Sequence, residues 1–318
     1  MFGKKILYKN MKKNITVKVP ATSANLGPGF DCLGAALGLY NTFRVSLDAK
    51  RECSEIVVKG CGKGVIPENG KNIVFRVIKD LFKENGKNLP SIKLEIVNNI
   101  PVARGLGSSS SAIVGGLCLA NELLGRKYRD EELIRKAVDI EGHADNVVPA
   151  FKGGLCITRV ENGGVPWWKL RVSSDLCACV CMPEFPVMTK KARELMPLKY
   201  SRKTSVFTTS GAAFFVSAVT SKCSKERNYI IEKAMEDKFH QPHRKKLVKG
   251  MEQVFEAGKK SGALGVALSG SGPSIIAIAI KNTNVEAIGS AMTKAFNWSG
   301  VASGYKILNF ISNGAIIS

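Results

Sequence analysis

A segment of small residues, PVARGLGSSSSAIVGG, runs from Pro101 to Gly116 and leads directly into an apolar stretch. Glycines followed by small and apolar residues at helical spacing predict a turn that delivers the chain into a buried helix from about Ser109 to Gly125. The start of such a helix has up to four unpaired backbone N–H groups and about half a positive charge, so it can bind phosphate without a lysine. The segment is therefore either a phosphate-binding loop or a structural helix cap with a serine-rich loop.

Two common nucleotide-binding signatures are absent from this segment. No lysine follows Gly107, which excludes G-x-x-x-x-G-K-[ST], and the glycine spacing does not match G-x-G-x-x-G. The serine hydroxyls can still contact phosphate oxygens or Mg²⁺, as the Ser or Thr of a P-loop does. A phosphate site here would belong to a different class of nucleotide-binding protein.

The composition is that of an ordinary globular protein. The chain has 318 residues, of which 45% are hydrophobic and 23% charged, and this length predicts two domains with a substantial core. The longest uncharged runs, 205–221 and 263–280, contain Ser, Thr, Gly or Pro, so we expect both in the core and no membrane partner. Residues 1–13 carry five lysines without the apolar part of a secretory signal, which predicts a cytoplasmic protein with a basic N-terminal arm.

The formal net charge of +21 has two interpretations. It can serve solubility and attract anionic small molecules, or it can indicate a nucleic-acid-binding protein. The lysines are spread along the chain without an RNA-binding aromatic signature or a helix-turn-helix pattern, so we expect no nucleic-acid partner. Nine cysteines at irregular spacings predict free thiols, and Cys177, Cys179 and Cys181 are expected on one buried face of a strand.

The pattern along the chain is that of a mixed α/β protein. Alternating residues over 15–19 predict a strand that stops at Pro20. Further strands are expected over 41–48, 54–60 and 91–100, and helices over 72–85 and 129–141. A turn-rich stretch around Pro166 predicts the boundary between an N-terminal domain, residues 14–165, and a C-terminal domain, residues 166–318.

Five segments in order look like the motifs of one superfamily. They are PATSANLGPGFD at 20–31, PVARGLGSSSSA at 101–112, EGHADNVVPAFKGG at 141–154, MTKKARELMP at 188–197 and SGSGPS at 269–274. From about residue 16 to 310 the chain resembles the GHMP kinase superfamily, and within it the branch that phosphorylates homoserine. This resemblance implies a two-domain α/β fold of the α+β type. The N-terminal, ATP-binding domain would resemble domain 2 of ribosomal protein S5, and the C-terminal domain would be ferredoxin-like.

The resemblance implies that ATP phosphorylates the side-chain hydroxyl of L-homoserine to O-phospho-L-homoserine, in threonine biosynthesis. Asn25 and Asp31 would contact this substrate, Asp31 at its ammonium, while Arg193 and Arg244 would bind its carboxylate. The catalytic group around the reacting hydroxyl would be His143, Asp145 and Asn146, and the first two of these would also contact the substrate. Two alternatives remain open: another GHMP small-molecule kinase, such as one for mevalonate or a sugar, and a nucleotide- or nucleic-acid-binding protein without catalysis.

The implied cofactors are ATP and Mg²⁺. The residues expected at ATP are Pro101, Val102, Ala103, Arg104, Gly105, Leu106, Gly107, Ser108, Ser109, Ser110, Ser111, Gly270 and Gly272. Mg²⁺ prefers oxygen ligands, which favours Ser109 and one carboxylate. The family pattern Glu-x-Glu-Gly is Asp139-Ile140-Glu141-Gly142 here, so we expect Glu141 as the metal ligand and Asp139 as the alternative. A homodimer is left open as the assembly.

Overall fold

The computed structural model describes residues 14–47 and 53–318, and the predicted basic arm, residues 1–13, lies outside them. The described residues form two β-sheets. The strands of the larger sheet are β1 (Asn14–Asn25), β2 (Gly29–Leu47), β3 (Glu55–Gly60), β4 (Ile92–Asn98), β5 (Leu155–Thr158), β6 (Trp167–Leu170) and β11 (Ile316–Ile317). The strands of the smaller sheet are β7 (Leu176–Pro183), β8 (Gly265–Leu268), β9 (Ile275–Ile280) and β10 (Ser303–Asn309).

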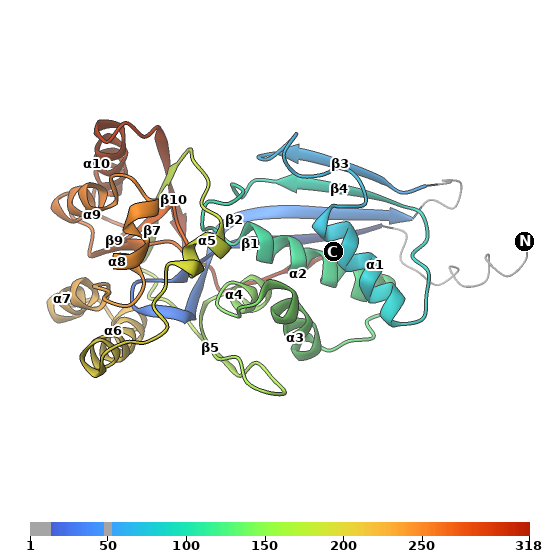
Figure 1. Ribbon diagram of the computed structural model, residues 1–318, viewed down its shortest axis with the longest axis horizontal. Coiled ribbons are helices and arrows are strands. Elements are labelled where there is room, and N and C mark those ends of the chain that lie inside the picture. Colours follow the sequence, from blue (N-terminus) through green and yellow to red (C-terminus); the bar gives the residue numbers. More distant parts are fainter. Residues whose placement is uncertain (1–13, 48–52) are drawn as a thin grey trace, which may run out of the picture.

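The larger sheet has the strand order β11-β1-β2-β4-β3, and β5 pairs with both β2 and β6. It lies on the right in Figure 1, and the smaller sheet, of order β10-β7-β9-β8, lies on the left. Most neighbouring strands are antiparallel, but β3 and β4 run parallel because α1 (Ile73–Glu84) connects them. This is the mixed α/β architecture that the sequence predicts.

The antiparallel pair of β1 and β2 carries the first motif at its turn. The prediction that the first strand stops at Pro20 is wrong, because β1 continues to Asn25. The register of the two strands shifts between Pro20 and Ala21, and such an irregularity accommodates a residue without an N–H to donate. The extended strand brings Asn25, and after a short turn Asp31, to the same end of the sheet.

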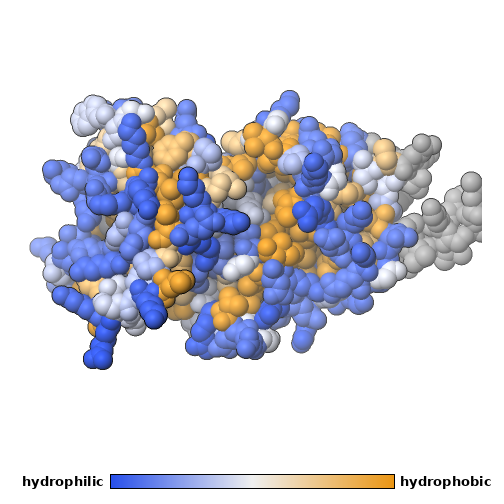
Figure 2. Space-filling view, viewed as in Figure 1, coloured by the Kyte–Doolittle hydropathy of each residue, from blue (hydrophilic) through white to orange (hydrophobic). Residues whose placement is uncertain are grey.

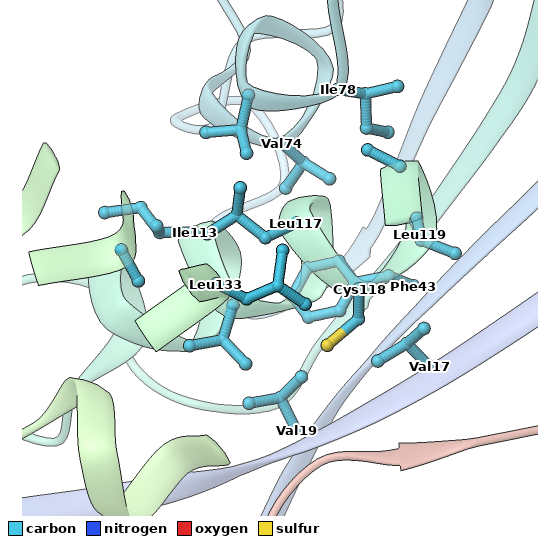
Figure 3. Packing of buried hydrophobic residues seen from close by; sticks show 14 of the residues in the cluster. Val17, Val19, Phe43, Val74, Ile78, Ile113, Leu117, Cys118, Leu119 and Leu133 are labelled. Atoms are coloured by element: carbon cyan, nitrogen blue, oxygen red, sulfur yellow. The ribbon is translucent and has the colours of Figure 1, made fainter. Parts of the chain in front are cut away.

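Helix α2 (Ser108–Leu123) is the central helix of the larger half, as predicted. It packs among α1, α3 (Asp130–Glu141), α4 (Val147–Lys152) and the sheet, and nearly every residue after its first turn is buried. Figure 3 shows this core, with Ile113, Leu117 and Cys118 of α2 among Val74, Ile78, Leu133, Val17, Val19 and Phe43. Each buried aliphatic or aromatic side chain contributes about 1.5–3 kcal/mol, so packing along its whole length holds the glycine-rich start of α2 in place.

The smaller sheet is covered on both faces. Helices α9 (Met251–Lys260) and α10 (Val285–Trp298) pack on one face, and α6 (Arg202–Thr220) and α7 (Lys225–Ala234) pack on the other. Cys177, Cys179 and Cys181 are buried against the first pair of helices, as the spacing predicts. The short helix α5 (Thr189–Glu194) lies between the two halves, and the short helix α8 (Gln241–Arg244) lies in the half with the smaller sheet. A 3₁₀ turn, η1 (Lys245–Leu247), follows α8 directly.

One uncharged run is less buried than predicted. Residues 263–280, which form β8 and β9, are almost completely buried, but α6 buries only one side, with Phe215 at its centre. Val206 and Phe214 of the same helix are exposed. An uncharged run rich in Ser, Thr and Ala therefore does not specify burial, because these small side chains occur readily at the surface.

The predicted domain boundary at residues 165 and 166 stays a prediction. By strand pairing, β6 and the C-terminal β11 belong to the larger sheet, so sheet membership changes between β6 and β7. Within residues 14–47 and 53–318, no helix is long and apolar enough to cross a membrane. The cytoplasmic location, the lack of a nucleic-acid partner and the homodimer also stay predictions.

Candidate active site

A cavity of about 480 Å³ lies where the two halves of the molecule meet, at the start of α2. Figure 2 shows hydrophobic residues in two groups, one on each half of the molecule, with hydrophilic residues between and around them. The predicted site residues that line the cavity are Asn25, Asp31, Val102, Ala103, Arg104, Gly105, Leu106, Gly107, Ser108, Ser109, Glu141, His143, Asp145, Asn146, Arg193, Arg244 and Gly270. Pro101, Ser110, Ser111 and Gly272 do not line it. The fold thus brings six distant segments of the chain to one place.

The glycines before α2 are required by close contacts with strand β1 and with the turn that follows β8. Gly107 is the N-cap of α2 at a φ of +67°, and a Cβ atom there would lie 1.9 Å from Thr22 Oγ1. A Cβ atom at Gly105 would lie 2.1 Å from the carbonyl oxygen of Ser269. In the described part of the chain no side chain caps α2, and Ser108 and Ser109 line the cavity. The helix start therefore offers backbone donors and positive charge to an anion.

The Glu141 carboxylate reaches the start of α2. It accepts hydrogen bonds from Ser109 Oγ at 2.8 Å and from Ser110 Oγ at 2.7 Å, and its side chain is 12% exposed. Asp139, by contrast, pairs with Arg135 at the surface and is 56% exposed. Ser109 and Glu141 are therefore adjacent oxygen donors, and they fit the hard Mg²⁺ ion that the sequence predicts there.

His143 and Asp145 form a buried pair beside Glu141. His143 Nδ1 lies 2.7 Å from an Asp145 carboxylate oxygen, and Nε2 lies 3.8 Å from Glu141 Oε1. Burial works against protonation, but the hydrogen bond and the charges of Asp145 and Glu141 outweigh it and raise the pKa of His143. The amide oxygen of Asn146 accepts a hydrogen bond from Thr22 Oγ1 at 2.7 Å. The three predicted catalytic residues thus lie together, next to the helix start.

Asp31 and Arg193 pair directly across the cavity. Arg193 Nη1 and Nη2 donate to the two carboxylate oxygens of Asp31 at 2.9 and 2.6 Å. Arg244 is only 2% exposed and donates to the carbonyl oxygens of Ala192 at 3.4 Å and Gly270 at 3.2 Å. The three residues that the sequence assigns to a zwitterionic substrate therefore line one cavity.

The Phe30 ring lies close to both guanidinium groups, 5.6 Å from that of Arg193 and 5.1 Å from that of Arg244. Burial, together with the positive charge of Arg193, lowers the pKa of Arg244 to about 10. Burial acts in the same direction on Arg193, but the hydrogen bonds and charge of Asp31 outweigh it and raise the pKa of Arg193. Two cationic groups beside one cavity suit an anionic substrate group.

Asn25 lines the cavity, but its amide also holds backbone groups in place. Its Nδ2 atom donates to the carbonyl oxygen of Gly270 at 2.8 Å, and its Oδ1 atom accepts from the N–H of Asp31 at 3.1 Å. Asn25 and Asp31 both have a positive φ, which short polar side chains tolerate better than most. Asn25 therefore fixes Asp31 relative to the SGSGPS segment at 269–274, and its predicted contact with the substrate stays a prediction.

One arm of the cavity is apolar, and of its residues the sequence predicted only Val102 at the site. It is lined by Phe43, Val65, Ile66, Pro67, Ile73, Val74, Ile96, Val102 and Ala112. These residues come from β2, the 61–72 connection, α1, β4, the loop before α2, and α2 itself, so no single sequence pattern contains them. The one available signal was the apolar run Val65-Ile66-Pro67 inside an otherwise polar loop.

Arg104 is in the predicted loop but is already engaged. Its guanidinium donates to the carbonyl oxygens of Val102, at 3.2 Å, and of Glu184. The N–H of Val187 also donates to the carbonyl oxygen of Ala103 at 3.2 Å. These bonds tie the loop before α2 to the segment that leads into α5. A contact of Arg104 with ATP stays a prediction.

Comparisons with known proteins define the class. The family model described as GHMP kinases N terminal domain matches residues 72–154, and the model described as GHMP kinases C terminal matches residues 221–297. Together with the fold and the site, these matches define a GHMP kinase, a class that uses ATP.

Similarity to individual proteins shows which family within the GHMP kinases the chain belongs to. The chain is 41% identical to a homoserine kinase from Carboxydothermus hydrogenoformans, over 90% of this chain and 91% of the relative. It is 40% identical to a homoserine kinase from Persephonella marina, over 95% and 98% of the two chains. The crystal structure of homoserine kinase from Cytophaga hutchinsonii matches with a TM-score of 0.85 at 29% identity, over 98% and 99%. The chain belongs to the homoserine kinase family, as its motifs predict.

Proposed function

We propose that this kinase transfers the γ-phosphoryl group of ATP to the side-chain hydroxyl of L-homoserine. The observation that supports this most is that Asp31, Arg193 and Arg244 line the same cavity as the start of α2. An α-amino acid needs an anion for its ammonium and a planar donor for its carboxylate. Mevalonate and sugars carry no ammonium, so with them Asp31 would gain no partner from the substrate.

The cavity has two regions that would complement the two parts of the nucleotide. Its phosphates would lie against the loop from Gly105 to Ser109, where backbone N–H groups and the helix charge favour an anion. Its base would enter the apolar arm between Val65 and Phe43, since ligand pockets bury flat apolar groups against such side chains. This orientation directs the γ-phosphate toward the polar end of the cavity that holds Asp145.

Mg²⁺ would be held by Ser109 and Glu141. Among the described residues there is no group of three His, Cys, Asp or Glu side chains able to hold a metal ion. The protein would therefore supply two oxygen ligands, as is usual for Mg²⁺ bound with phosphates. The ion would neutralise charge on the phosphate oxygens when bound.

The reacting hydroxyl would be oriented by Asp145 and Asn146. Phosphoryl transfer spreads charge over the phosphoryl oxygens and depends mainly on positioning and electrostatics, so a strong base is not required. The 2.7 Å hydrogen bond from His143 fixes the Asp145 carboxylate, and that from Thr22 fixes the Asn146 amide. These contacts hold both groups in one geometry before the substrate arrives.

A coupled assay of ADP release tests the substrate assignment. The purified chain would be given ATP and Mg²⁺ with L-homoserine, mevalonate or galactose at equal concentrations. We expect turnover with L-homoserine and almost none with the other two. Faster turnover of mevalonate or galactose would move the assignment to another GHMP kinase reaction, and no ADP release with any of the three would contradict kinase activity on these alcohols.

A further inference from the structure

A second histidine, His240, contacts one of the site arginines, although it does not line the cavity. It is completely buried and immediately precedes α8, one helical turn before Arg244. Its Nδ1 atom lies 3.4 Å from Arg244 Nη1, and its ring centre lies 5.5 Å from that of Phe30. His240 therefore belongs to the wall that holds the Arg244 guanidinium.

The partners of His240 fix its tautomer. Its Nε2 atom lies 2.7 Å from the carbonyl oxygen of Gly27 and 3.4 Å from an Asp237 carboxylate oxygen. Both partners are acceptors, so Nε2 carries the hydrogen and Nδ1 keeps a lone pair. That lone pair accepts from Arg244. Burial lowers the pKa of His240, and the charge of Arg244 adds to this against the opposing charge of Asp237, so the ring stays neutral.

Asp237 fixes the place of His240. Its buried carboxylate accepts hydrogen bonds from the N–H groups of Phe239 at 2.8 Å, His240 at 2.9 Å and Gln241 at 2.8 Å. The Gln241 side chain in turn accepts from the N–H of Leu268 at 2.7 Å, which anchors α8 to the smaller sheet. The backbone of His240 is thus held in place by Asp237, and its ring is held by the contacts of its two nitrogen atoms.

We propose that His240 is a positioning residue that sets the spacing between the two ends of the substrate site. Through Nε2 it holds the Gly27 carbonyl, in the turn that leads to Asp31. Through Nδ1 it holds Arg244. It therefore joins the element that presents the carboxylate for a substrate ammonium to the guanidinium for a substrate carboxylate. This inference rests on the proposed function, in which Arg244 binds the carboxylate of homoserine.

Two substitutions separate the two contacts of His240. In His240→Gln the amide nitrogen can take the place of Nε2 and donate to Gly27, but Arg244 loses its acceptor. In His240→Asn the amide oxygen takes the place of Nδ1 and accepts from Arg244, but Gly27 loses its donor. We expect His240→Gln to raise KM for L-homoserine roughly three- to tenfold, with kcat and KM for ATP nearly unchanged. We expect His240→Asn also to raise KM for L-homoserine, because the Gly27 turn that leads to Asp31 is then no longer held, and to lower the melting temperature.

His243→Gln is the matched control, because His243 lies on the same short helix and packs edge-on against Tyr200. It should leave KM and the melting temperature unchanged. KM does not depend on the fraction of folded enzyme, so partial unfolding of a variant cannot imitate the expected result. The positioning role is overturned if either His240→Gln or His240→Asn keeps the wild-type KM for L-homoserine.

Arg244→Leu separates this inference from the proposed function. If that variant keeps the wild-type preference for L-homoserine over 3-aminopropanol, which lacks the carboxylate, the proposed function fails. If it loses the preference while His240→Gln behaves as wild type, only the inference about His240 fails. A measurement on the wild-type protein is independent of both variants: the ¹⁵N shifts of the His240 ring should show a neutral ring protonated at Nε2, and protonation at Nδ1 would overturn the proposal.

Discussion

Asp31 and Arg193 neutralise each other through two hydrogen bonds of 2.6 and 2.9 Å, although the proposed function assigns them to opposite ends of one substrate. Both side chains are 37% exposed, so a small molecule can reach the pair. A zwitterion can replace this ion pair with two, Asp31 with its ammonium and Arg193 with its carboxylate. No charge is then left unpaired. An unpaired charge in this partly buried site would be unfavourable.

Asp31→Asn should therefore act mainly on substrates that carry an ammonium. A hydrogen bond to a charged group is worth about 1.5–3 kcal/mol, so kcat/KM for L-homoserine should fall roughly 10- to 150-fold. The affinity for 4-hydroxybutyrate, which lacks the ammonium, should change far less when it is measured as a competitive inhibitor. Equal losses for both compounds would contradict the role given to Asp31.

Asp175→Asn is the matched control for this experiment. Asp175 pairs with both terminal nitrogens of Arg227, at 3.0 and 2.9 Å, but neither residue lines the cavity. Because Arg227 is buried, the substitution should lower the melting temperature. It should leave the preference between the two compounds as it is in the wild type.

The metal assignment predicts unequal effects of two neighbouring carboxylates. Glu141→Gln should raise the Mg²⁺ concentration needed for half-maximal turnover by roughly tenfold or more, because it weakens an oxygen ligand beside Ser109. Asp139→Asn should have little effect, since Asp139 makes a surface pair with Arg135. Titration of kcat with Mg²⁺ measures both, and the reverse order would transfer the ligand role to Asp139.

Gly107→Ala should destabilise the protein even without nucleotide. Thr22 Oγ1, which the new Cβ atom would meet, is buried and bonded to Asn146, so it cannot turn away freely. Gly86→Ala is the matched control, because Gly86 has a similar φ of +64° but open space around it. The control should lose about 1–2 kcal/mol from the left-handed backbone alone, and Gly107→Ala should lose clearly more. Equal losses in urea unfolding would mean that the contact with Thr22 relaxes.

The raised pKa of His143 predicts a pH-dependent contribution to stability. The folded state holds the His143 proton more tightly than the unfolded state does, so this contribution is fully present below the usual histidine pKa of about 6.5. It is lost as the pH rises through the folded-state pKa. The melting temperature of the wild type should therefore exceed that of His143→Gln most at low pH, and a difference that grows with pH would contradict the assignment.

The sequence predicts elements and motifs well where local pattern decides them. Helix α2 and the strand face of the three cysteines both follow from spacing and turn chemistry. The prediction that the first strand ends at Pro20 was wrong because a register shift lets β1 continue past this residue, and that shift depends on the partner strand. The prediction that the run 205–221 lies in the core was wrong for one side of α6, because an absence of charge does not specify burial.

In the candidate site, too, the sequence predicts what local motifs determine but not what depends on tertiary packing. The motifs indicated Asp31 and Glu141, the family resemblance indicated Arg244, and the fold places all three on one cavity. The direct pairing of Asp31 with Arg193 could not be predicted, because the two residues lie far apart in the sequence and meet only through tertiary packing. Apart from Val102, the apolar arm was missed for the same reason, since its side chains come from elements whose arrangement no local pattern specifies.

The most direct test of the account is the preference for L-homoserine over 3-aminopropanol, which keeps the ammonium and hydroxyl but lacks the carboxylate. The ratio of kcat/KM for the two compounds would be measured for the wild type, Arg193→Leu and Arg244→Leu. The account predicts a strong preference in the wild type that falls roughly 10- to 150-fold in each variant, since each loses a charged hydrogen-bond donor. If both variants prefer L-homoserine as strongly as the wild type does, these arginines do not bind the carboxylate and the account is contradicted.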